Sequence, residues 1–523
     1  MSEIILNEVT FYYSSPYKSI FENLTLNIST DWKTGLIGRN GRGKTTLLNL
    51  IHGDTEPVKG RIIKPVKTEI FPFRNVDENK NTFEVIKNSI APFDEWEKIM
   101  NKCLEKNDKE SLDIYSETHE KYMFYNGYEI DSVIDREINE MNLDRSILER
   151  PFQTLSGGEK TRSLIISLFL KKDIFPLIDE PTNHIDIESR EKLGNYLKKK
   201  NGFILISHDR YFLDLCTDHI LSINKNDVRI SSCNYSVWEY NMKLEQQAED
   251  KQNEKLKSEI TQLKEASKRS RKWSESKENE KAAHSDKGAI GAQAARLMKQ
   301  AINFEKRIDK NIEEKKKLFR NTEKDYDLKI YPTGNIPNNI LEIRNLSVEF
   351  DGRKIFDNFN LTVSRGERVA LTGKNGSGKT SVFNAILGKI NNYSGFIHIP
   401  SFVNISLARQ IPQWQKGTLK DLIEKNYIDE IKFRQILGNF NVRGDIWDKP
   451  LEYFSEGEKK KIELCRTIID PVMFLMWDEP LNYLDISTRG KIEESVLKYQ
   501  PTMLFIEHDR YFTEKIATKI IYM

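Results

Sequence analysis

The chain has 523 residues, 38% of them hydrophobic and 31% charged, and a formal net charge of only +2. This length is too great for one ordinary core and predicts about three domains. The chain contains no run of about eighteen apolar residues and no secretory signal at its start, which argues against a membrane-spanning or secreted protein and predicts a cytoplasmic one. Its four scattered cysteines fit reduced thiols better than a disulfide framework or a zinc site.

Two glycine-rich segments indicate phosphate binding. Residues 38–45, GRNGRGKT, match the pattern GxxxxGK(S/T) between an apolar pair and a helical run, and residues 373–380, GKNGSGKT, repeat it. Glycines let backbone N–H groups turn towards phosphate oxygens, the lysine adds a positive charge, and the last hydroxyl is suited to Mg²⁺. The predicted phosphate-binding residues are Gly38, Asn40, Gly41, Gly43, Lys44, Thr45 and Thr46 in the first half, and Gly373, Asn375, Gly376, Gly378, Lys379, Thr380 and Ser381 in the second.

Three further motifs also occur once in each half, in the same order. They are LSGGE at 155–159 and FSEGE at 454–458, FPLIDE at 175–180 and FLMWDE at 474–479, and SHDR at 207–210 and EHDR at 507–510. With these motifs the chain resembles the ATP-binding cassette (ABC) proteins, whose Walker A, signature, Walker B and switch-histidine motifs follow in this order. The resemblance implies an α/β fold with two ABC-type nucleotide-binding domains of the P-loop NTPase class. It also implies hydrolysis of ATP to ADP and phosphate, with ATP and Mg²⁺ as cofactors.

The resemblance further implies roles for single residues. The implied metal ligands are Thr45, Asp179, Thr380, Gln410 and Asp478. The implied catalytic residues are Glu180 and Glu479, which would orient or deprotonate the attacking water, and His208 and His508, which would contact the γ-phosphate. Tyr13 and Phe350 lie at corresponding places before the two Walker A motifs, where ABC proteins stack an aromatic ring on adenine. As single aromatics among strand-like residues, they could equally belong to the core.

ABC cassettes pair head to tail, so each ATP is expected to lie between the two halves. Site one would consist of the Walker motifs and His208 of the first half, closed by Ser455 and Gly457. Site two would consist of the Walker motifs and His508 of the second half, closed by Ser156, Gly157 and Gly158.

The departures from the family pattern fall on site one. Gln410 occupies the glutamine position that follows the strand after Walker A, whereas Phe73 occupies that position in the first half. The signature that closes site one has Glu456 where a glycine is usual. A carboxylate near the triphosphate is repulsive unless it turns away, and a phenyl ring cannot bind Mg²⁺. We therefore hypothesise that site one closes or hydrolyses ATP less readily than site two.

The spacing of the repeats reveals an insertion. Lys44 and Lys379 are 335 positions apart, but Asp179 and Asp478 are 299 apart, so about 36 additional residues lie in the first half. Apolar residues recur at helical spacing near residues 96–104. We expect a helical insertion over about residues 83–150, which is either functional or a harmless surface addition.

The segment between the halves has a different composition. Residues 241–320 contain 21 Lys and Arg against 14 Asp and Glu, and apolar residues recur at helical spacing. We expect helices over 241–273 and 290–325 joined by a polar turn at 274–289, as an antiparallel hairpin. The predicted domains are 1–239, a nucleotide-binding domain; 240–325, the helical hairpin linker; and 326–523, a second nucleotide-binding domain. A basic projection predicts a polyanionic partner, although a solvated charged helix is the alternative.

Two cassettes, no membrane segment and a charged helical linker resemble the ABC-F proteins, which act on ribosomes. Residues 263–266, 272–273 and 287–299 are similar to antibiotic-resistance members of the Lsa and Vga kind, and the short C-terminus after His508 also suits the Lsa kind. In that family the linker enters the tRNA exit site and approaches the peptidyl-tRNA. The resemblance implies a monomer that binds the bacterial ribosome and displaces lincosamides, streptogramin A compounds or pleuromutilins. The expected RNA or tRNA contacts are Lys268, Arg269, Arg271, Lys272, Trp273, Lys277, Lys281, Lys287, Arg296 and Lys299.

Three alternatives remain at this stage. The first is a housekeeping ABC-F translation factor that acts on stalled ribosomes, and the second is the motor subunit of a drug exporter. The third is a structural ABC ATPase acting on DNA, although such chains usually insert zinc modules or much longer coiled coils.

Overall fold

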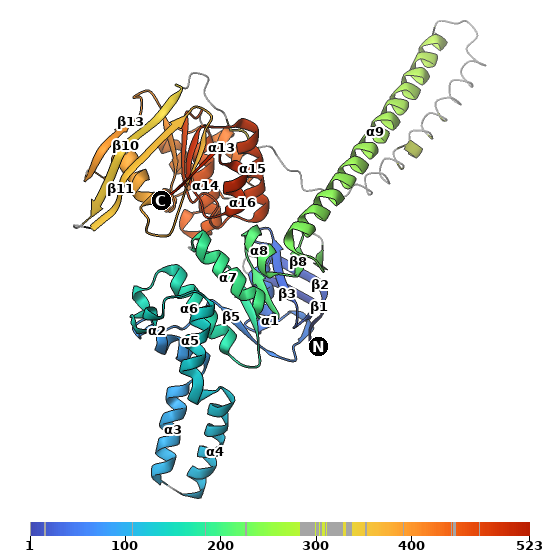
Figure 1. Cartoon of the computed structure of the whole chain (residues 1–523). Helices are drawn as coiled ribbons and strands as arrows, with labels where there is room; N and C mark the ends of the chain where they lie inside the picture. Colours follow the sequence, from blue (N-terminus) through green and yellow to red (C-terminus); the bar gives the residue numbers. More distant parts are fainter. Residues whose placement is uncertain are drawn as a thin grey trace. The chain divides into compact units, whose positions relative to one another are not determined.

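A computed structural model describes residues 2–14, 17–106, 108–183, 185–224, 227–282, 299, 303, 306–308, 310, 328–330, 337–350, 353–390, 392–440, 442, 446–469 and 471–523. The chain divides into two compact units (Figure 1). One comprises Met1–Ser236 with Tyr326–Met523, and the other comprises Val237–Asp325. Within the described residues, no helix is both long and apolar enough to cross a membrane.

The described residues of the first half form two sheets. A six-stranded sheet has the order β5-β6-β7-β3-β8-β9, and only the β8–β9 pair is antiparallel. A three-stranded antiparallel sheet has the order β2-β1-β4. The strands are β1 (Glu3–Ser14), β2 (Tyr17–Ser29), β3 (Lys33–Gly38), β4 (Lys59–Ile63), β5 (Lys67–Phe71), β6 (Ile174–Asp179), β7 (Phe203–Ile206), β8 (His219–Ile223) and β9 (Val228–Ser231). The helices are α1 (Lys44–His52), α2 (Thr82–Ile90), α3 (Phe93–Lys106), α4 (Lys109–Phe124), α5 (Ile130–Glu140), α6 (Gly157–Leu170), α7 (Ile187–Lys199) and α8 (Arg210–Cys216).

The second half repeats this plan. Its five-stranded parallel sheet has the order β14-β15-β16-β12-β17, and its antiparallel sheet has the order β11-β10-β13. The strands are β10 (Asn339–Phe350), β11 (Arg353–Ser364), β12 (Arg368–Thr372), β13 (Tyr393–His398), β14 (Ile405–Ala408), β15 (Phe474–Asp478), β16 (Met503–Ile506) and β17 (Lys519–Tyr522). The helices are α11 (Lys379–Ile386), α12 (Leu419–Lys425), α13 (Glu430–Asn439), α14 (Glu456–Ile468), α15 (Ile486–Tyr499) and α16 (Arg510–Ile516). The expected α/β fold with two ABC-type domains is confirmed.

Local sequence explains the central elements. Strands β7, β15 and β16 are buried at every position, which is why they read as continuous apolar runs rather than alternating ones. Helices α6 and α14 each begin with a capping box, in which the serine of the signature motif and a glutamate three residues later satisfy each other's backbone N–H groups. The sequence of each signature motif therefore fixes where its helix starts.

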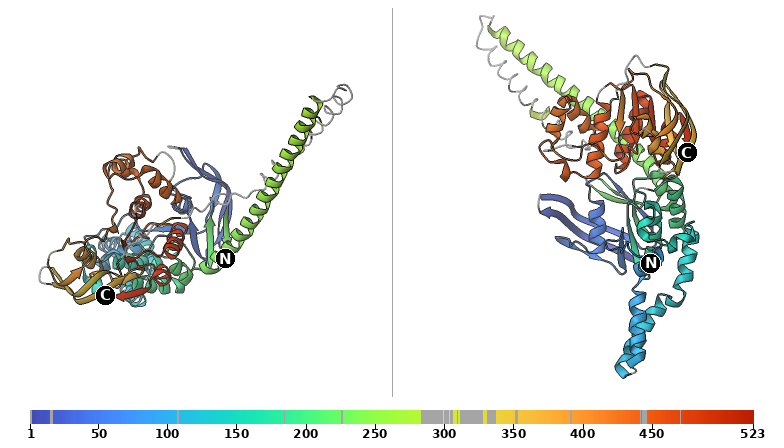
Figure 2. Two further views of the ribbon diagram at one scale, coloured as in Figure 1. Left: turned by 90° about the horizontal axis from the view of Figure 1, so that it is seen from above. Right: turned by 90° about the vertical axis from the view of Figure 1, so that its left-hand side faces the viewer.

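Between α1 and α6, the first half carries additional helices. Helices α3 and α4 lie side by side, as both Figure 1 and Figure 2 show. Phe93 packs edge-on against Trp96 and Tyr122, and Met100 is buried, whereas Leu104 is exposed. The apolar spacing seen in the sequence therefore marks the residues that pack between these two helices.

Helix α9 (Tyr235–Ala282) is longer than the sequence predicted. The helix predicted over 241–273 was to end in a polar turn, but α9 continues through residues 274–282. This segment has no Gly or Pro, and five of its nine residues are Glu or Lys, which favour a helix even without apolar periodicity. Ile260 of α9 is buried together with Ile308, with Leu263 packed against them. The rest of the second predicted helix and the turn lie largely outside the described residues.

Phe433 of α13 should be a main contributor to the stability of the second half. Its ring is fully buried and packs against Trp414 and Trp447. Replacing it with alanine is expected to cost about 3–5 kcal/mol of unfolding free energy because the cavity does not collapse. Ile431→Ala on the same helix, at a position 70% exposed, should change stability by no more than about 0.5 kcal/mol. Chemical denaturation measures both, and equal effects would contradict this packing.

Candidate active site

Three of the four paired motifs meet at one edge of the larger sheet in each half. In the first half, the carboxyl ends of β3, β6 and β7 lead directly into Walker A, Walker B and the switch-histidine segment, and these strands are neighbours in the order β6-β7-β3. In the second half, β12, β15 and β16 have the same arrangement. Parallel sheets bind ligands at the carboxyl ends of their strands. The fold therefore collects segments more than a hundred residues apart into one site in each half.

The two Walker A loops have the same geometry. The lysine ammonium groups curl back into the loop, with Lys44 Nζ donating to the Gly38 carbonyl at 2.8 Å and Lys379 Nζ donating to the Gly373 carbonyl at 2.8 Å. Gly43 and Gly378 have φ values of 94° and 97°, and a Cβ there would lie within 2.4 Å of Ile20 and 2.6 Å of Phe356. Only glycine fits these positions, so both loops can wrap a phosphate group.

In the first half, Walker B places two carboxylates beside the Walker A helix. Thr45 Oγ1 donates to Asp179 Oδ2 at 2.9 Å. Burial, together with the charge of Asp179, raises the pKa of Glu180 to about 7. His208 Nε2 lies 3.4 Å from Glu180 Oε1, and burial and the charge of Lys44 hold the pKa of this histidine well below its usual range. No donor among the described residues bonds to the buried Glu180 Oε1, although the backbone N–H of His208 bonds to this carboxylate.

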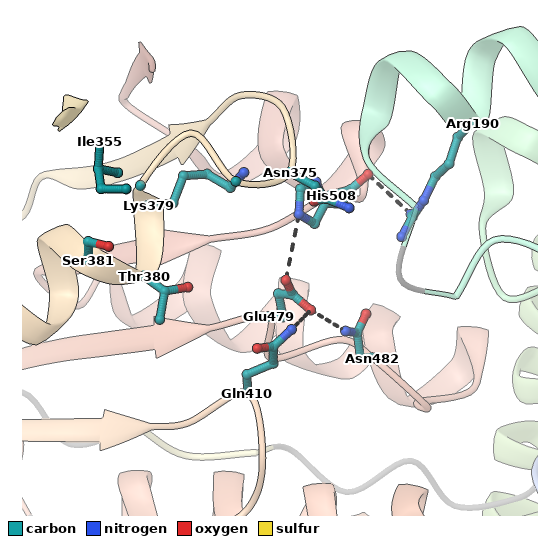
Figure 3. A pocket seen from close by; sticks show the side chains of 12 residues that line it. Arg190, Ile355, Asn375, Lys379, Thr380, Ser381, Gln410, Glu479, Asn482 and His508 are labelled. Carbon is teal, nitrogen blue, oxygen red and sulfur yellow. Dashed lines mark hydrogen bonds and ion pairs between the residues drawn. The ribbon is translucent and has the colours of Figure 1, made fainter. Parts of the chain in front are cut away.

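In the second half, the corresponding glutamate is held by amide donors (Figure 3). Gln410 Nε2 donates to Glu479 Oε2 at 2.9 Å, and Asn482 Nδ2 donates to the same oxygen at 2.5 Å. His508 Nε2 lies 3.6 Å from Glu479 Oε1. Burial by itself would raise the pKa of Glu479, but His508 and the two amides outweigh it and lower the pKa to about 2. The carboxylate of Glu479 is therefore ionised and held by two side-chain amides. Glu180 accepts a backbone hydrogen bond from His208 but none from a side-chain amide among the described residues, and it is not fully ionised at neutral pH.

Strand register places Phe73 at the position of Gln410. Phe71 pairs with Ile178 and Ala408 pairs with Trp477, which are the residues before the two Walker B aspartates. Phe73 and Gln410 each stand two residues beyond these pairs. The ring of Phe73 lies under Lys171, with Nζ 4.8 Å from the ring centroid. The first half thus has a cation over an aromatic ring where the second half presents an amide to its glutamate.

The second half also offers oxygen donors suited to Mg²⁺. Thr380 and Gln410 line an open pocket of about 340 Å³ with Lys379, Glu479 and His508 (Figure 3). Asp478 Oδ1 is buried without a hydrogen-bond partner, and burial and the charge of Glu479 raise the pKa of Asp478 to about 6. A hydroxyl, an amide and one carboxylate are a fitting donor set for a hard cation whose remaining ligands are phosphate and water.

The halves exchange matching contacts near Walker A. The backbone N–H of Asn40 donates to Asp485 Oδ2 at 3.3 Å, and that of Asn375 donates to Asp186 Oδ2 at 3.3 Å. A Cβ added to Gly457, in the second signature, would lie 3.1 Å from Asn40 Nδ2. Each Walker A loop is thus touched by the other half, as head-to-tail pairing requires.

Sequence reasoning missed several of these residues. Asp186 and Asp485, and Asn482 beside Glu479, belong to the motifs PTNHID at 181–186 and PLNYLD at 480–485. The two motifs are 299 positions apart, the same offset as the Walker B motifs, and this repetition was the signal that could have revealed them. Arg190, which donates to the backbone carbonyl of His508 at 3.2 Å, is repeated 299 positions later as Arg489, so the same signal could have revealed it.

Three further residues were singled out from the sequence, namely Glu456, Tyr13 and Phe350. Glu456, expected near site one, turns to Lys459 of its own helix at 2.9 Å, which moves its charge aside. Tyr13 is 43% exposed, and its hydroxyl lies 3.1 Å from Thr46 Oγ1 at the start of α1, a position open to a base. The side chain of Phe350 lies outside the described residues.

Gly457 and its counterpart Gly158 offer a matched test of the signature geometry. A methyl group at Gly457 would meet the Tyr483 carbonyl at 2.7 Å, whereas at Gly158 it would meet only Ile185, at 3.8 Å. Gly457→Ala is expected to destabilise the protein by about 1–3 kcal/mol through overpacking. Gly158→Ala, at an uncrowded helical position, should be neutral or stabilising by up to about 1 kcal/mol. Thermal unfolding of the two variants distinguishes them, and equal shifts would refute the crowding.

Comparison with known proteins agrees with this geometry. The profile of the ABC transporter family matches residues 21–183 and 356–482. The chain is 30% identical over 530 residues to ribosome protection protein VmlR of Bacillus subtilis, covering 98% of this chain and 86% of that protein. It is 28% identical over 529 residues to energy-dependent translational throttle protein EttA of Escherichia coli K12, covering 97% and 89%. A solved structure of archaeal ribosome recycling factor aABCE1 with the stalk protein aP1 has a TM-score of 0.60 at 16% identity, covering 98% of this chain and 87% of that one, which shows a shared fold.

Two matched nucleotide-binding domains, each with Walker A, Walker B and the switch histidine gathered at one sheet edge, define an ATPase with tandem ATP-binding cassettes. The chain belongs to the ABC family and, within it, to the ABC-F proteins, as the sequence motifs predicted.

Proposed function

We propose that this protein is an ATP-dependent ribosome-binding factor that protects the ribosome from antibiotics acting at the peptidyl transferase centre. The observation that carries the proposal is the similarity to ribosome protection protein VmlR along 98% of the chain, which includes the linker as well as the cassettes. The drugs we propose are lincosamides, streptogramin A compounds and pleuromutilins. The protein would act in the cytoplasm as a monomer.

The linker supplies the contact to RNA in this proposal. We assign it to residues 240–325, between domains of residues 1–239 and 326–523. Lys268, Arg269 and Lys272 are exposed on α9. Cations exposed on a helix neutralise phosphates and release counterions, giving affinity without sequence reading. We propose that they meet ribosomal RNA or peptidyl-tRNA near the tRNA exit site, together with Lys299, which is also exposed.

ATP binding and hydrolysis would control when the linker binds the ribosome. Walker A and the opposing signature residues would bind ATP between the halves, and Tyr13 and Phe350 would flank the adenine. At site two, Thr380, Asp478 and Gln410 would hold Mg²⁺, which would offset the charge of the phosphates. Thr45 and Asp179 would do so at site one. Glu479 would orient the attacking water, and His508 would contact the γ-phosphate. Closure would favour ribosome binding, and hydrolysis would release the protein.

A housekeeping role in translation is the second candidate. It is favoured by the 28% identity to energy-dependent translational throttle protein EttA over 97% of the chain. Such a factor would bind ribosomes in the same ATP-dependent way but would leave drug sensitivity unchanged.

Two measurements separate these functions. The protein, incubated with a non-hydrolysable ATP analogue, should sediment with bacterial ribosomes and stay in the supernatant with ADP. Expression in a sensitive bacterium should raise the inhibitory concentration of lincomycin without changing drug accumulation. Ribosome binding with an unchanged inhibitory concentration would favour the housekeeping role. Reduced accumulation would indicate an exporter subunit, and binding to DNA rather than ribosomes would refute both ribosomal roles.

A further inference from the structure

Helix α14 carries three charged residues on one side that its counterpart α6 lacks. Lys460, Glu463 and Arg466 recur at three-residue spacing, so they lie along one face of the helix. The equivalent residues of α6, 299 positions earlier, are Thr161, Leu164 and Ser167. The two helices otherwise begin with the same capping box. Only the second half therefore places these charges next to its β14 loop.

Lys460 is buried and forms hydrogen bonds to the backbone of the segment that contains Gln410. Its side chain is 1% exposed, and Nζ donates to the carbonyls of Arg409 at 2.8 Å and Gln410 at 3.3 Å. The same ammonium donates to the carbonyl of Asp478 at 3.3 Å. One side chain thus ties the loop after β14 to the end of β15, where the catalytic glutamate follows.

Glu463 and Arg466 make further hydrogen bonds to this loop, Glu463 as an acceptor and Arg466 as a donor. Glu463 is 1% exposed and accepts the backbone N–H groups of Arg409 at 3.3 Å and Gln413 at 3.2 Å. Arg466 bridges Glu463 at 3.1 Å and donates to the carbonyl of Leu407 at 2.6 Å. The backbone from residue 407 to residue 413 is therefore fixed by both donors and acceptors of α14.

Burying an ammonium group is costly unless all its hydrogen bonds are made. A buried lysine is therefore unexpected at a position where the side chain only has to fill space. A threonine serves at the same position of α6. What distinguishes the two halves at this place is Gln410, whose amide reaches Glu479 at 2.9 Å, against Phe73, which reaches no carboxylate in the described contacts. The charged residues of α14 thus occur in the half that has Gln410, and they are absent from the half that has Phe73.

We propose that Lys460, supported by Glu463, is a positioning residue for ATP hydrolysis at site two. It holds the Gln410 loop and the end of β15 together, so that the Gln410 amide stays on Glu479. Lys460 lies one turn after Gly457, at the start of the helix whose signature touches the first half. Closure of the signature against Walker A of the first half would thus reach the catalytic carboxylate of the second half through a single helix. This inference rests on the proposed roles of Gln410 and Glu479.

The test is a double-mutant cycle in full-length protein carrying Glu180→Gln, so that hydrolysis reports on site two. Lys460→Met keeps the length of the side chain and removes its hydrogen bonds. We expect kcat to fall about tenfold in Lys460→Met and in Gln410→Ala, with KM for ATP changed less than about twofold, and no further fall in the double variant. Multiplied losses in the double variant, or an unchanged kcat in Lys460→Met, would overturn the proposal.

Further variants separate this from a general loss of structure. Thr161→Met, at the equivalent position of α6, should leave kcat within about twofold of its background. Lys460→Arg, which keeps the charge, should recover at least part of the loss. If Lys460→Met does not fold, the same cycle with Lys460→Gln and Gln410→Ala decides, because a structural role predicts independent effects. Glu479→Gln in this background must lower hydrolysis; if it does not, the assignment of site two fails rather than the role of Lys460.

Discussion

Glu479→Gln should lower kcat for ATP hydrolysis by about 10²-fold or more, the usual contribution of a positioned general base, whereas Glu180→Gln should lower it by less than about threefold. The reason is the difference in surroundings. Glu479 is ionised and held by the amides of Gln410 and Asn482, whereas Glu180 has a buried oxygen without a donor and a pKa raised to about 7 by burial and by Asp179. A carboxyl group that is partly protonated at neutral pH is a poorer acceptor for the proton of water.

Steady-state phosphate release measures this difference. The control is binding of a fluorescent ATP analogue, which should be retained in both variants because glutamine has the size of glutamate. Equal losses of kcat from the two substitutions would show that the sites are equivalent and would remove the functional meaning of Phe73. Grafting the glutamine, as Phe73→Gln, is not expected to restore site one by itself, since α6 lacks the counterparts of Lys460 and Glu463.

The triple substitution of Lys268, Arg269 and Lys272 by Glu should weaken ribosome binding strongly and change its salt dependence. If each cation meets one phosphate, the slope of log affinity against log salt concentration should fall in magnitude by about three. The reason is loss of counterion release, which does not depend on which bases lie nearby. These residues are exposed on α9, so the helix itself should keep its structure.

Sedimentation with ribosomes at about 50–200 mM salt and a non-hydrolysable ATP analogue measures the slope. A matched control is the replacement of Lys251, Lys255 and Lys257, exposed on the same helix nearer its start, by Glu. This second triple carries the same change of charge and should alter the slope by less than one. Identical slopes for the two triples would show that the charge of the protein as a whole, rather than the far part of α9, contacts RNA.

Much of the site was predictable because its chemistry is encoded locally. Gly38–Thr45 and Gly373–Thr380 dictate a phosphate loop through backbone conformation alone, and the apolar runs before Asp179 and Asp478 dictate buried strands ending in carboxylates. The end of α9 was predicted wrongly. The polar segment 274–289, with Gly288, was taken for a turn, although its first nine residues lack Gly and Pro and five of them are Glu or Lys, which favour a helix.

The sequence by itself determined the chemistry that each half carries. Each phosphate loop, each pair of Walker B carboxylates and the identity of the residue at the Phe73 or Gln410 position can be read from a short segment. Tertiary structure decided what these residues touch. That Gln410 and Asn482 fix Glu479, that Asp186 and Asp485 reach the opposite Walker A loops, and that Lys460 ties β14 to β15 all depend on contacts between distant segments. Such contacts follow from how strands and helices pack, and the spacing of residues within one motif does not predict them. The physical asymmetry of the two sites therefore begins with one substitution and is completed by the surrounding fold.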